Sequence, residues 1–170
     1  LANLSYLIGI SHDFGKGTDF FQKRLQGKIN KSDLTNHGLL SAIFSYVLID
    51  QYVDNKKISI MAYIAVRRHH GNLQSPFIDI ENEYILKKQF KSLKQKKLKK
   101  IYNKLLSGFN IDFDFVLARV EKIIDGPENF IQNEIPMVLD NIKTIEKENI
   151  KDFLICNLLY SVLIDMDKSK

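Results

Sequence analysis

The sequence has a single cysteine, Cys156, among 170 residues. This count excludes a disulfide framework and a zinc site built on thiolates, and it predicts a reducing, cytoplasmic setting. Long apolar runs are also missing, because the two longest, 41–49 and 153–164, are well short of the roughly 18–20 residues that span a bilayer. Residues 1–10 lack the basic region and the small-residue cleavage site of a signal peptide. We therefore expect no membrane partner.

Strand-type alternation, internal repeats and low-complexity linkers are absent as well. Apolar residues instead recur at helical spacing along almost the whole chain. We predict one all-α domain over residues 1–170, and we expect an N-terminally truncated fragment because the chain begins without Met inside a helical pattern. The predicted helices are 1 to about 11–15, 20–25, 37–53, 59 to 69–71, 86–105 as one helix or a pair, 113–124, 128–148 and 150–167. Gly27 is expected as the left-handed cap after 20–25, Asn36 as the N-cap of 37–53, and Ser59 as the first residue of the next helix.

The charge of the chain is unevenly distributed. The net charge is +5, but residues 1–110 carry 18 basic and 8 acidic side chains (net +10), whereas residues 111–170 carry 7 and 12 (net −5). A basic half beside an acidic half predicts a polyanionic partner on one side of the molecule.

Histidine is scarce too, with four in the chain. His12 is followed directly by Asp13 at the end of an apolar helical pattern. Adjacent residues on a helix point about 100° apart, so these two side chains can hold one ion from two sides, or the carboxylate can bridge to a second ion. Lys16 lies on the same face if the helix continues. A cation beside a metal site suits a phosphate group.

The other three histidines border predicted loops, where a site is both held and open. His37 stands at a predicted helix start, and His69 and His70 stand at a predicted helix end. The last predicted helix adds Asp165 and Asp167. Imidazoles and carboxylates without a thiolate suit divalent transition-metal ions or a mixed site with magnesium. Two ions about 3.5–4 Å apart would stabilise the attacking and leaving oxygens of a phosphodiester displacement.

Each of these residues also has a purely structural explanation. His37 alone is typical of a hydrogen-bonded core histidine, and His69 with His70 can act as favourable cations at a helix C-terminus. A His-Asp dipeptide also arises by chance. The whole inventory favours a metal site, because all four histidines occupy candidate positions and none remains as an ordinary surface residue.

The pattern resembles the HD superfamily of metal-dependent phosphohydrolases, an all-helical group named for the doublet found here at His12 and Asp13. It is most similar to the HD nuclease that accompanies the helicase of type I CRISPR interference. The similarity includes the form HD-x-x-K, with Lys16, and the following stretch Gly-Thr-Asp-Phe-Phe-Gln at 17–22. It is carried by both ends of the chain and is thin over residues 77–150.

The remaining histidines and a late aspartate extend the resemblance. The separate histidine of that family matches His37, and its paired histidines match His69 and His70. Its terminal aspartate matches Asp167 best, with Asp165 as a rival. The family also uses a histidine upstream of the doublet, which residues 1–11 lack; we attribute this difference to truncation.

The resemblance implies a role for each matched residue. Asp13 would bridge two divalent ions, of a transition metal such as Mn, Ni, Co or Fe, or of Mg. His12 and Asp167 would hold one ion together with the upstream histidine, and the other ion would bind His37, His69 and His70. Asp13 and Lys16 would be the catalytic residues, since Lys16 would contact the scissile phosphate or balance its charge.

A lysine-rich segment, residues 87–104, contains nine lysines among 18 residues and no acidic residue. A solvated helix face explains it at least as well as a surface that follows a nucleic-acid backbone. Tyr84 and Tyr102 could stack on bases, whereas Phe90 fits the apolar core. Arg67 and Arg68, beside the paired histidines, are better candidates for phosphate contacts near the chemistry.

Together with the metal-ligand inventory, the resemblance implies a metal-dependent nuclease that acts on single-stranded DNA, or alternatively on RNA, in CRISPR antiviral defence. Its expected partners are the CRISPR helicase and the RNA-guided interference complex. One alternative is an HD-type nucleotide phosphohydrolase, against which the paired histidines and the basic N-terminal half argue. The other is a non-catalytic nucleic-acid-binding adaptor that keeps its histidines for structure.

Overall fold

The computed structural model describes residues 2–69, 83–127, 130, 135, 158 and 160–162. These residues form helices and no β-strand, which confirms the all-α prediction. No helix among them has both the length and the apolar character that a membrane crossing requires. The elements, where η marks a short 3-10 helix, are α1 (Ala2–Ser11), η1 (Phe14–Gly17), α2 (Asp19–Leu25), η2 (Asp33–Thr35), α3 (Gly38–Val53), α4 (Lys56–Arg68), α5 (Glu83–Lys91), α6 (Gln95–Leu105) and α7 (Phe113–Ile124).

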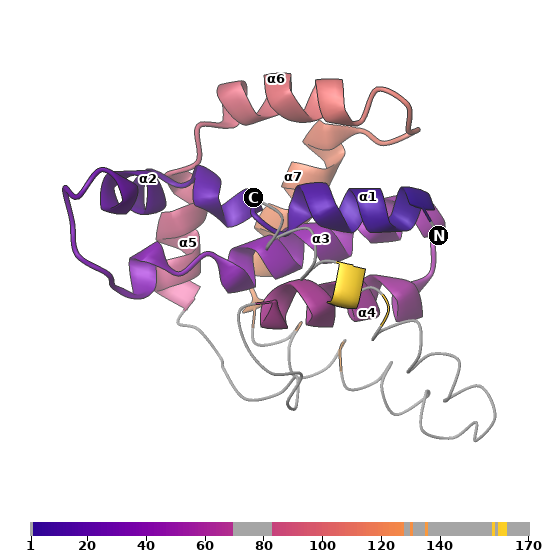
Figure 1. Cartoon of the computed structure of the whole chain (residues 1–170), viewed down its shortest axis with the longest axis horizontal. Coiled ribbons are helices and arrows are strands. Elements are labelled where there is room, and N and C mark those ends of the chain that lie inside the picture. The colour runs from indigo at the N-terminus through magenta and orange to yellow at the C-terminus, as the bar shows by residue number, and fades with distance from the viewer. Residues whose placement is uncertain are drawn as a thin grey trace.

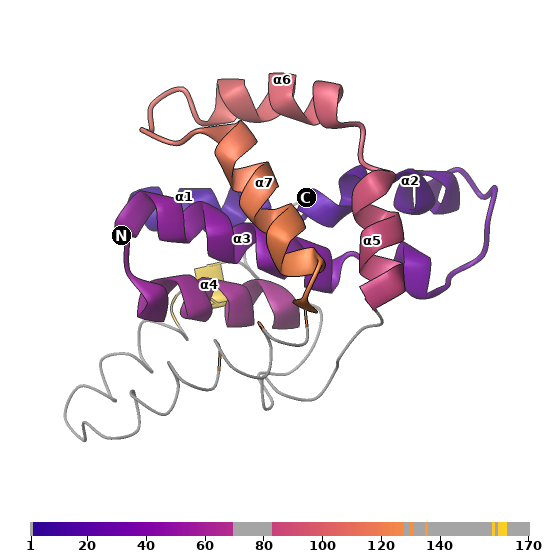
Figure 2. The same ribbon diagram turned by 180° about the vertical axis from the view of Figure 1, so that it is seen from behind.

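Helix α3 is the centre of the fold. Helix α1 packs on one side of it and α7 crosses on the other, as the two opposite views in Figure 1 and Figure 2 show, while α4 runs alongside. The spacing of Leu40, Phe44, Val47 and Leu48 in the sequence predicts that they form one apolar helix face, and all four are buried. The burial of α3 extends well beyond this one face, because 13 of its 16 residues are buried. Neighbours on several sides therefore fix α3 firmly, together with the residue that precedes it, His37.

Two helix starts differ from the prediction. Helix α4 begins at Lys56 rather than at Ser59, because the side chain of Asn55 accepts hydrogen bonds from the backbone amides two and three residues further on, at 3.1 and 3.3 Å. The N-cap position of α3 belongs to His37 rather than Asn36. The Asn36 Oδ1 still accepts a hydrogen bond from the first amide of the helix at 3.1 Å.

Elsewhere the predicted helices match more closely. Gly27 has the expected left-handed backbone, with a φ of 69°. Residues 86–105 form two helices, α5 and α6, and buried Leu93 lies between them. Ile101 of α6 is 42% exposed although it continues the helical spacing of Leu86, Phe90 and Leu93. The helices predicted over 128–148 and 150–167 lie outside the described residues, apart from isolated positions.

An aromatic cluster anchors the segment that follows the His-Asp doublet. Phe14, in η1, stacks on Phe44 of α3 with ring centroids 3.8 Å apart. Tyr102 of α6 lies edge-on to Phe44 at 5.1 Å and stacks on Phe113 of α7 at 5.0 Å. Such pairs add to the stabilisation that comes from burying the rings. The cluster ties η1 to three helices of the bundle.

A buried ion cluster joins α3, α4 and α7. Asp50 is 7% exposed and accepts hydrogen bonds from Lys56 Nζ and Arg119 Nη2, each at 2.8 Å. Burial opposes its ionisation, but the bonds from Lys56 and Arg119 outweigh this effect and hold the pKa of Asp50 below its usual range. The carboxylate therefore stays charged at neutral pH.

We expect Asp50→Ala to lower the free energy of unfolding by about 2–3 kcal/mol, because it removes two charge-assisted hydrogen bonds. The two cations are 30% and 52% exposed and can rehydrate, which keeps the loss from being larger. A folded-state pKa below the unfolded value stabilises the protein above the unfolded pKa, near 3.8. The difference between wild type and variant should therefore shrink as pH falls through about 4.

Urea unfolding at several pH values measures this effect. Glu121→Ala, which removes an exposed carboxylate from α7, is the control and should change stability by less than about 0.5 kcal/mol. A loss that is equal for both variants, or independent of pH, would contradict the proposed role of Asp50.

Candidate metal centre

The His-Asp doublet lies at a junction rather than on one continuous helix. Helix α1 ends at Ser11, and Asp13 occupies the N-cap position of the 3-10 turn η1. The His12 amide still bonds back to the Ile8 carbonyl at 3.0 Å. The change of helix type brings the two side chains together, with His12 Nε2 3.3 Å from Asp13 Oδ2.

Lys16 closes on the same carboxylate. Its Nζ lies 2.8 Å from Asp13 Oδ1, so the spacing of three residues brings these side chains together through the tight turn. Burial opposes ionisation of Asp13, but its interactions with His12 and Lys16 outweigh that effect and hold the pKa of Asp13 far below its usual range. Asp13 therefore stays ionised at physiological pH and can offer an anionic oxygen to a metal ion.

Two of the histidines are held by backbone carbonyls. His12 Nδ1 lies 2.6 Å from the Gly9 carbonyl, and His69 Nδ1 lies 2.6 Å from the Val66 carbonyl. Because a carbonyl only accepts hydrogen bonds, each Nδ1 carries a proton and donates it. In the neutral ring Nε2 is then the basic nitrogen. Metal-binding histidines are commonly oriented by this kind of bond.

The end of α1 is also held by α6. The Tyr102 hydroxyl donates a hydrogen bond to the Ile10 carbonyl at 2.8 Å. Burial, reinforced by the negative charge of Asp13, raises the pKa of Tyr102 above its usual range. The hydroxyl therefore stays protonated and able to donate. Since Tyr102 is buried, the prediction that it could stack on bases is wrong. Tyr84, the other predicted stacking residue, is 59% exposed.

His37 reaches the site from the N-cap position of α3. Its Nε2 lies 3.7 Å from Asp13 Oδ1, and its ring packs edge-on against buried Phe21 with centroids 5.0 Å apart. The buried side chain of Gln89, in α5, holds the preceding loop through bonds from Nε2 to the carbonyls of Asn36 and, at 3.1 Å, Leu34. The loop that carries His37 is thus fixed from a distant part of the sequence.

Three of the predicted ligands converge on one point. Asp13, His37 and His69 each offer a ligand atom, and these atoms all lie within 4.8 Å of one another. The rings of His12 and His37 lie 5.3 and 5.7 Å from the ring of His69. One carboxylate with imidazoles and no thiolate fits a divalent ion. The group of Asp13, His37 and His69 could hold a metal ion, with His12 beside it.

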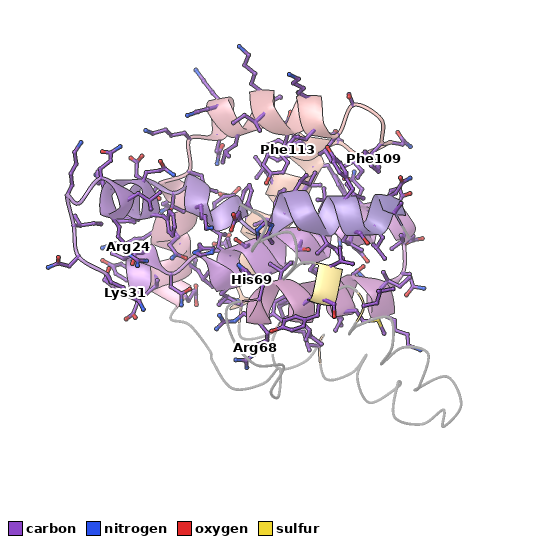
Figure 3. All side chains as sticks on the ribbon, in the orientation of Figure 1. Arg24, Lys31, Arg68, His69, Phe109 and Phe113 are labelled. Atoms are coloured by element: carbon purple, nitrogen blue, oxygen red, sulfur yellow. The ribbon has the colours of Figure 1, made fainter. Side chains whose placement is uncertain are left out.

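Figure 3 shows His69 near the middle of the bundle, with Arg68 closer to the edge. Arg67 and Arg68 are half-buried at the end of α4. Arg67 lies beside the start of α3, since a side-chain carbon added to Gly38 would be 3.3 Å from Arg67 Nη1. Arg67 is therefore close to the backbone of His37. The predicted ligands His70, Asp165 and Asp167 lie outside the described residues.

Sequence reasoning missed the residues that support the ligands. Gly15 lies against the His37 backbone, and its amide donates to Ser41 Oγ at 2.9 Å. A glycine inside a helical pattern is a usable signal for such a close approach. Gln89 gave no signal, because its partners are more than 50 residues away in sequence and it lies within the lysine-rich segment.

No protein-family model, no curated protein and no solved structure matches this chain. Its function is therefore inferred from the residues of this centre and the surfaces next to it.

Proposed function

We propose that this chain is an HD-type, metal-dependent phosphohydrolase that cleaves phosphodiester bonds in single-stranded nucleic acid. The observation that carries the proposal is the convergence of Asp13, His37 and His69 within 4.8 Å, next to His12 and Lys16. Three separate stretches of the pattern HD-x-x-K…H…H supply these groups. Their meeting in space is what the resemblance to HD hydrolases requires.

The residues of the centre divide the work. Divalent metal ions at such a centre supply Lewis acidity for the activation of water and the stabilisation of charge on phosphorus oxygens. Asp13 contributes negative charge, while His12 and His69 present nitrogens oriented by backbone carbonyls. Lys16 is 31% exposed and can meet a phosphate from the solvent side while it still neutralises Asp13. His70, Asp167 and a histidine upstream of the doublet would complete the proposed ligand set for two ions.

The proposed setting is CRISPR antiviral defence, as the resemblance implies. A nuclease of this type depends on a helicase to deliver a single strand, so the proposed partners are a CRISPR helicase and the RNA-guided complex that recruits it. The net charge of +10 over residues 1–110 supports a polyanionic substrate on the side that carries the centre.

The test is hydrolysis under defined metals. The protein is stripped with a chelator, and Mn, Ni, Co, Fe or Mg is then added with labelled single-stranded DNA, single-stranded RNA, duplex DNA or a panel of nucleotides. Metal-dependent cleavage of single strands is expected, with little on duplex. Calorimetric titration of each metal gives the stoichiometry, which should be two if both proposed ion positions exist.

Other outcomes distinguish the alternatives. Turnover of nucleotides without cleavage of strands would identify a nucleotide phosphohydrolase. Binding of nucleic acid with neither metal uptake nor hydrolysis would identify an adaptor that keeps its histidines for structure, and it would overturn the proposed function.

A further inference from the structure

An open groove of about 720 Å³ begins at the metal centre and runs between α2 and the loop that contains η2. Lys16 and His37 line its inner end, and both contact Asp13, at 2.8 and 3.7 Å. Arg24 and Lys31 line its outer part. Figure 3 shows these two residues close together at the end of the molecule formed by α2 and the following loop.

The groove is basic, and its outer cations are available. Three basic side chains, Lys16, Arg24 and Lys31, line it against one carboxylate, Asp33. Within the described part of the chain, neither Arg24 nor Lys31 forms an ion pair with a carboxylate. Cations that line a groove without an internal counter-charge favour an anionic ligand.

The walls of the groove are held in place. Phe21, on α2, is 7% exposed and packs against His37. On the other wall, Gln89 Nε2 bonds the carbonyls of Asp33 and Leu34 at 3.3 and 3.1 Å. A groove with fixed walls avoids part of the ordering cost of binding.

The lysine-rich segment is a weaker candidate for the same ligand, because several of its charges are neutralised within the protein. Lys87 pairs with Glu83 and Asp125, and Lys99 pairs with Asp114. Lys94, which lines a second groove of about 420 Å³ beside Lys16, pairs with Asp19 at 3.3 Å. These partners favour a mainly structural and solubilising role for the segment.

We propose that the groove from Lys16 to Arg24 and Lys31 binds the sugar-phosphate backbone of a single strand and leads it to the metal centre. This inference rests on the proposed function and adds to it a location for the strand. Lys16 would face the phosphate at the centre, while Arg24 and Lys31 would bind phosphates further along. A polymer would then be preferred over a mononucleotide, because only a polymer reaches the outer cations.

The experiment measures binding rather than cleavage. Fluorescence anisotropy with the double variant Arg24→Gln and Lys31→Gln is recorded in chelator, so that the result does not depend on metal loading. A twelve-nucleotide strand and a dinucleotide are compared, each as DNA and as RNA, between about 50 and 200 mM salt. The control is Lys96→Gln with Lys100→Gln, which removes the same charge from exposed positions on α6 that line neither groove.

The double variant should bind the twelve-nucleotide strand at least about tenfold more weakly, and its log–log salt slope should fall by about 1.4, or about 0.7 for each phosphate contact on a single strand. Its preference for the long strand over the dinucleotide should shrink. The control should keep the wild-type slope. Equal effects on DNA and RNA would identify the backbone as the shared ligand, and a larger effect on one of them would identify that strand as the ligand of the groove.

An unchanged affinity and slope in the Arg24 and Lys31 variant would overturn the inference, as would an equal or larger loss in the α6 control. These results can be told apart from a failure of the proposed function. If the wild-type protein cleaves strands and the double variant still binds them normally, only the assignment of the groove as the strand-binding site is overturned. Circular dichroism of each variant confirms that the fold is intact.

Discussion

Replacement of Asp13 by asparagine is expected to abolish metal-dependent cleavage and to weaken metal binding by at least about 100-fold. Asp13 is the common neighbour of the other groups of the centre. His12, His37 and Lys16 lie 3.3, 3.7 and 2.8 Å from its carboxylate oxygens. Asparagine keeps the shape of the side chain but removes the negative charge that a divalent ion needs from its ligands.

Metal titration calorimetry and strand cleavage measure this effect. The matched control is Asp54→Asn, an exposed position after α3 with a left-handed backbone (φ 46°) that asparagine tolerates. The control should retain wild-type metal binding and cleavage. Full cleavage by the Asp13 variant would refute the assignment of the centre, and so would metal binding that both substitutions weaken alike.

Much of the fold could be predicted because local signals and tertiary packing agree. Helix α7 matches the predicted residues 113–124, since an apolar stripe and the side-chain cap of Asp112 define the same segment. The start of α4 was predicted late, because Asn55 is an equally good cap three residues before the first strongly apolar stretch. The first residue of a helix is hard to predict where two nearby polar residues, here Asn55 and Ser59, can both serve as its N-cap.

The grouping of the candidate ligands could be predicted for a different reason. Histidines are few, so the position of each one carries information, and three of the six predicted ligands, Asp13, His37 and His69, lie within one group. His12 lies beside that group, whereas His70 and Asp167 lie outside the described residues. The supports could not be predicted, because the pairing of Gln89 with the loop before His37 depends on a fold in which α5 lies against η2.

The geometry of the doublet shows the same limit. The sequence pattern predicted that a continuous helix would keep Asp13 and Lys16 on one face, and these residues do meet. They meet through a 3-10 turn, whose side chains three residues apart nearly eclipse one another. The change of helix type at Asp13 depends on how η1 packs against α3, which hydropathy along the chain does not report.

The second large effect is expected at Gly15, which lets η1 approach the start of α3. A Cβ at this position would lie 2.7 Å from the His37 carbonyl oxygen and 2.9 Å from the His37 Cβ. Both contacts are closer than packed atoms allow, and backbone cannot move aside as a flexible side chain can. Gly15→Ala must therefore shift η1 away from His37 and separate Asp13 from its histidine partner.

We expect Gly15→Ala to cost about 1–3 kcal/mol of stability through overpacking and to reduce cleavage by about 100-fold through misplacement of the ligands. Gly17→Ala is the matched control in the same turn, because its Cβ would meet methyl groups of Leu98 at 3.2 and 3.5 Å, and these can move. That variant should lose less than about 1 kcal/mol and bind metal normally. Thermal unfolding and metal titration of both variants test this prediction. Equal behaviour of the two variants would show that the contact with His37 does not set the geometry of the centre. A loss of stability and metal binding in the Gly15 variant alone would show that the doublet and His37 keep their relative positions only while residue 15 has no side chain.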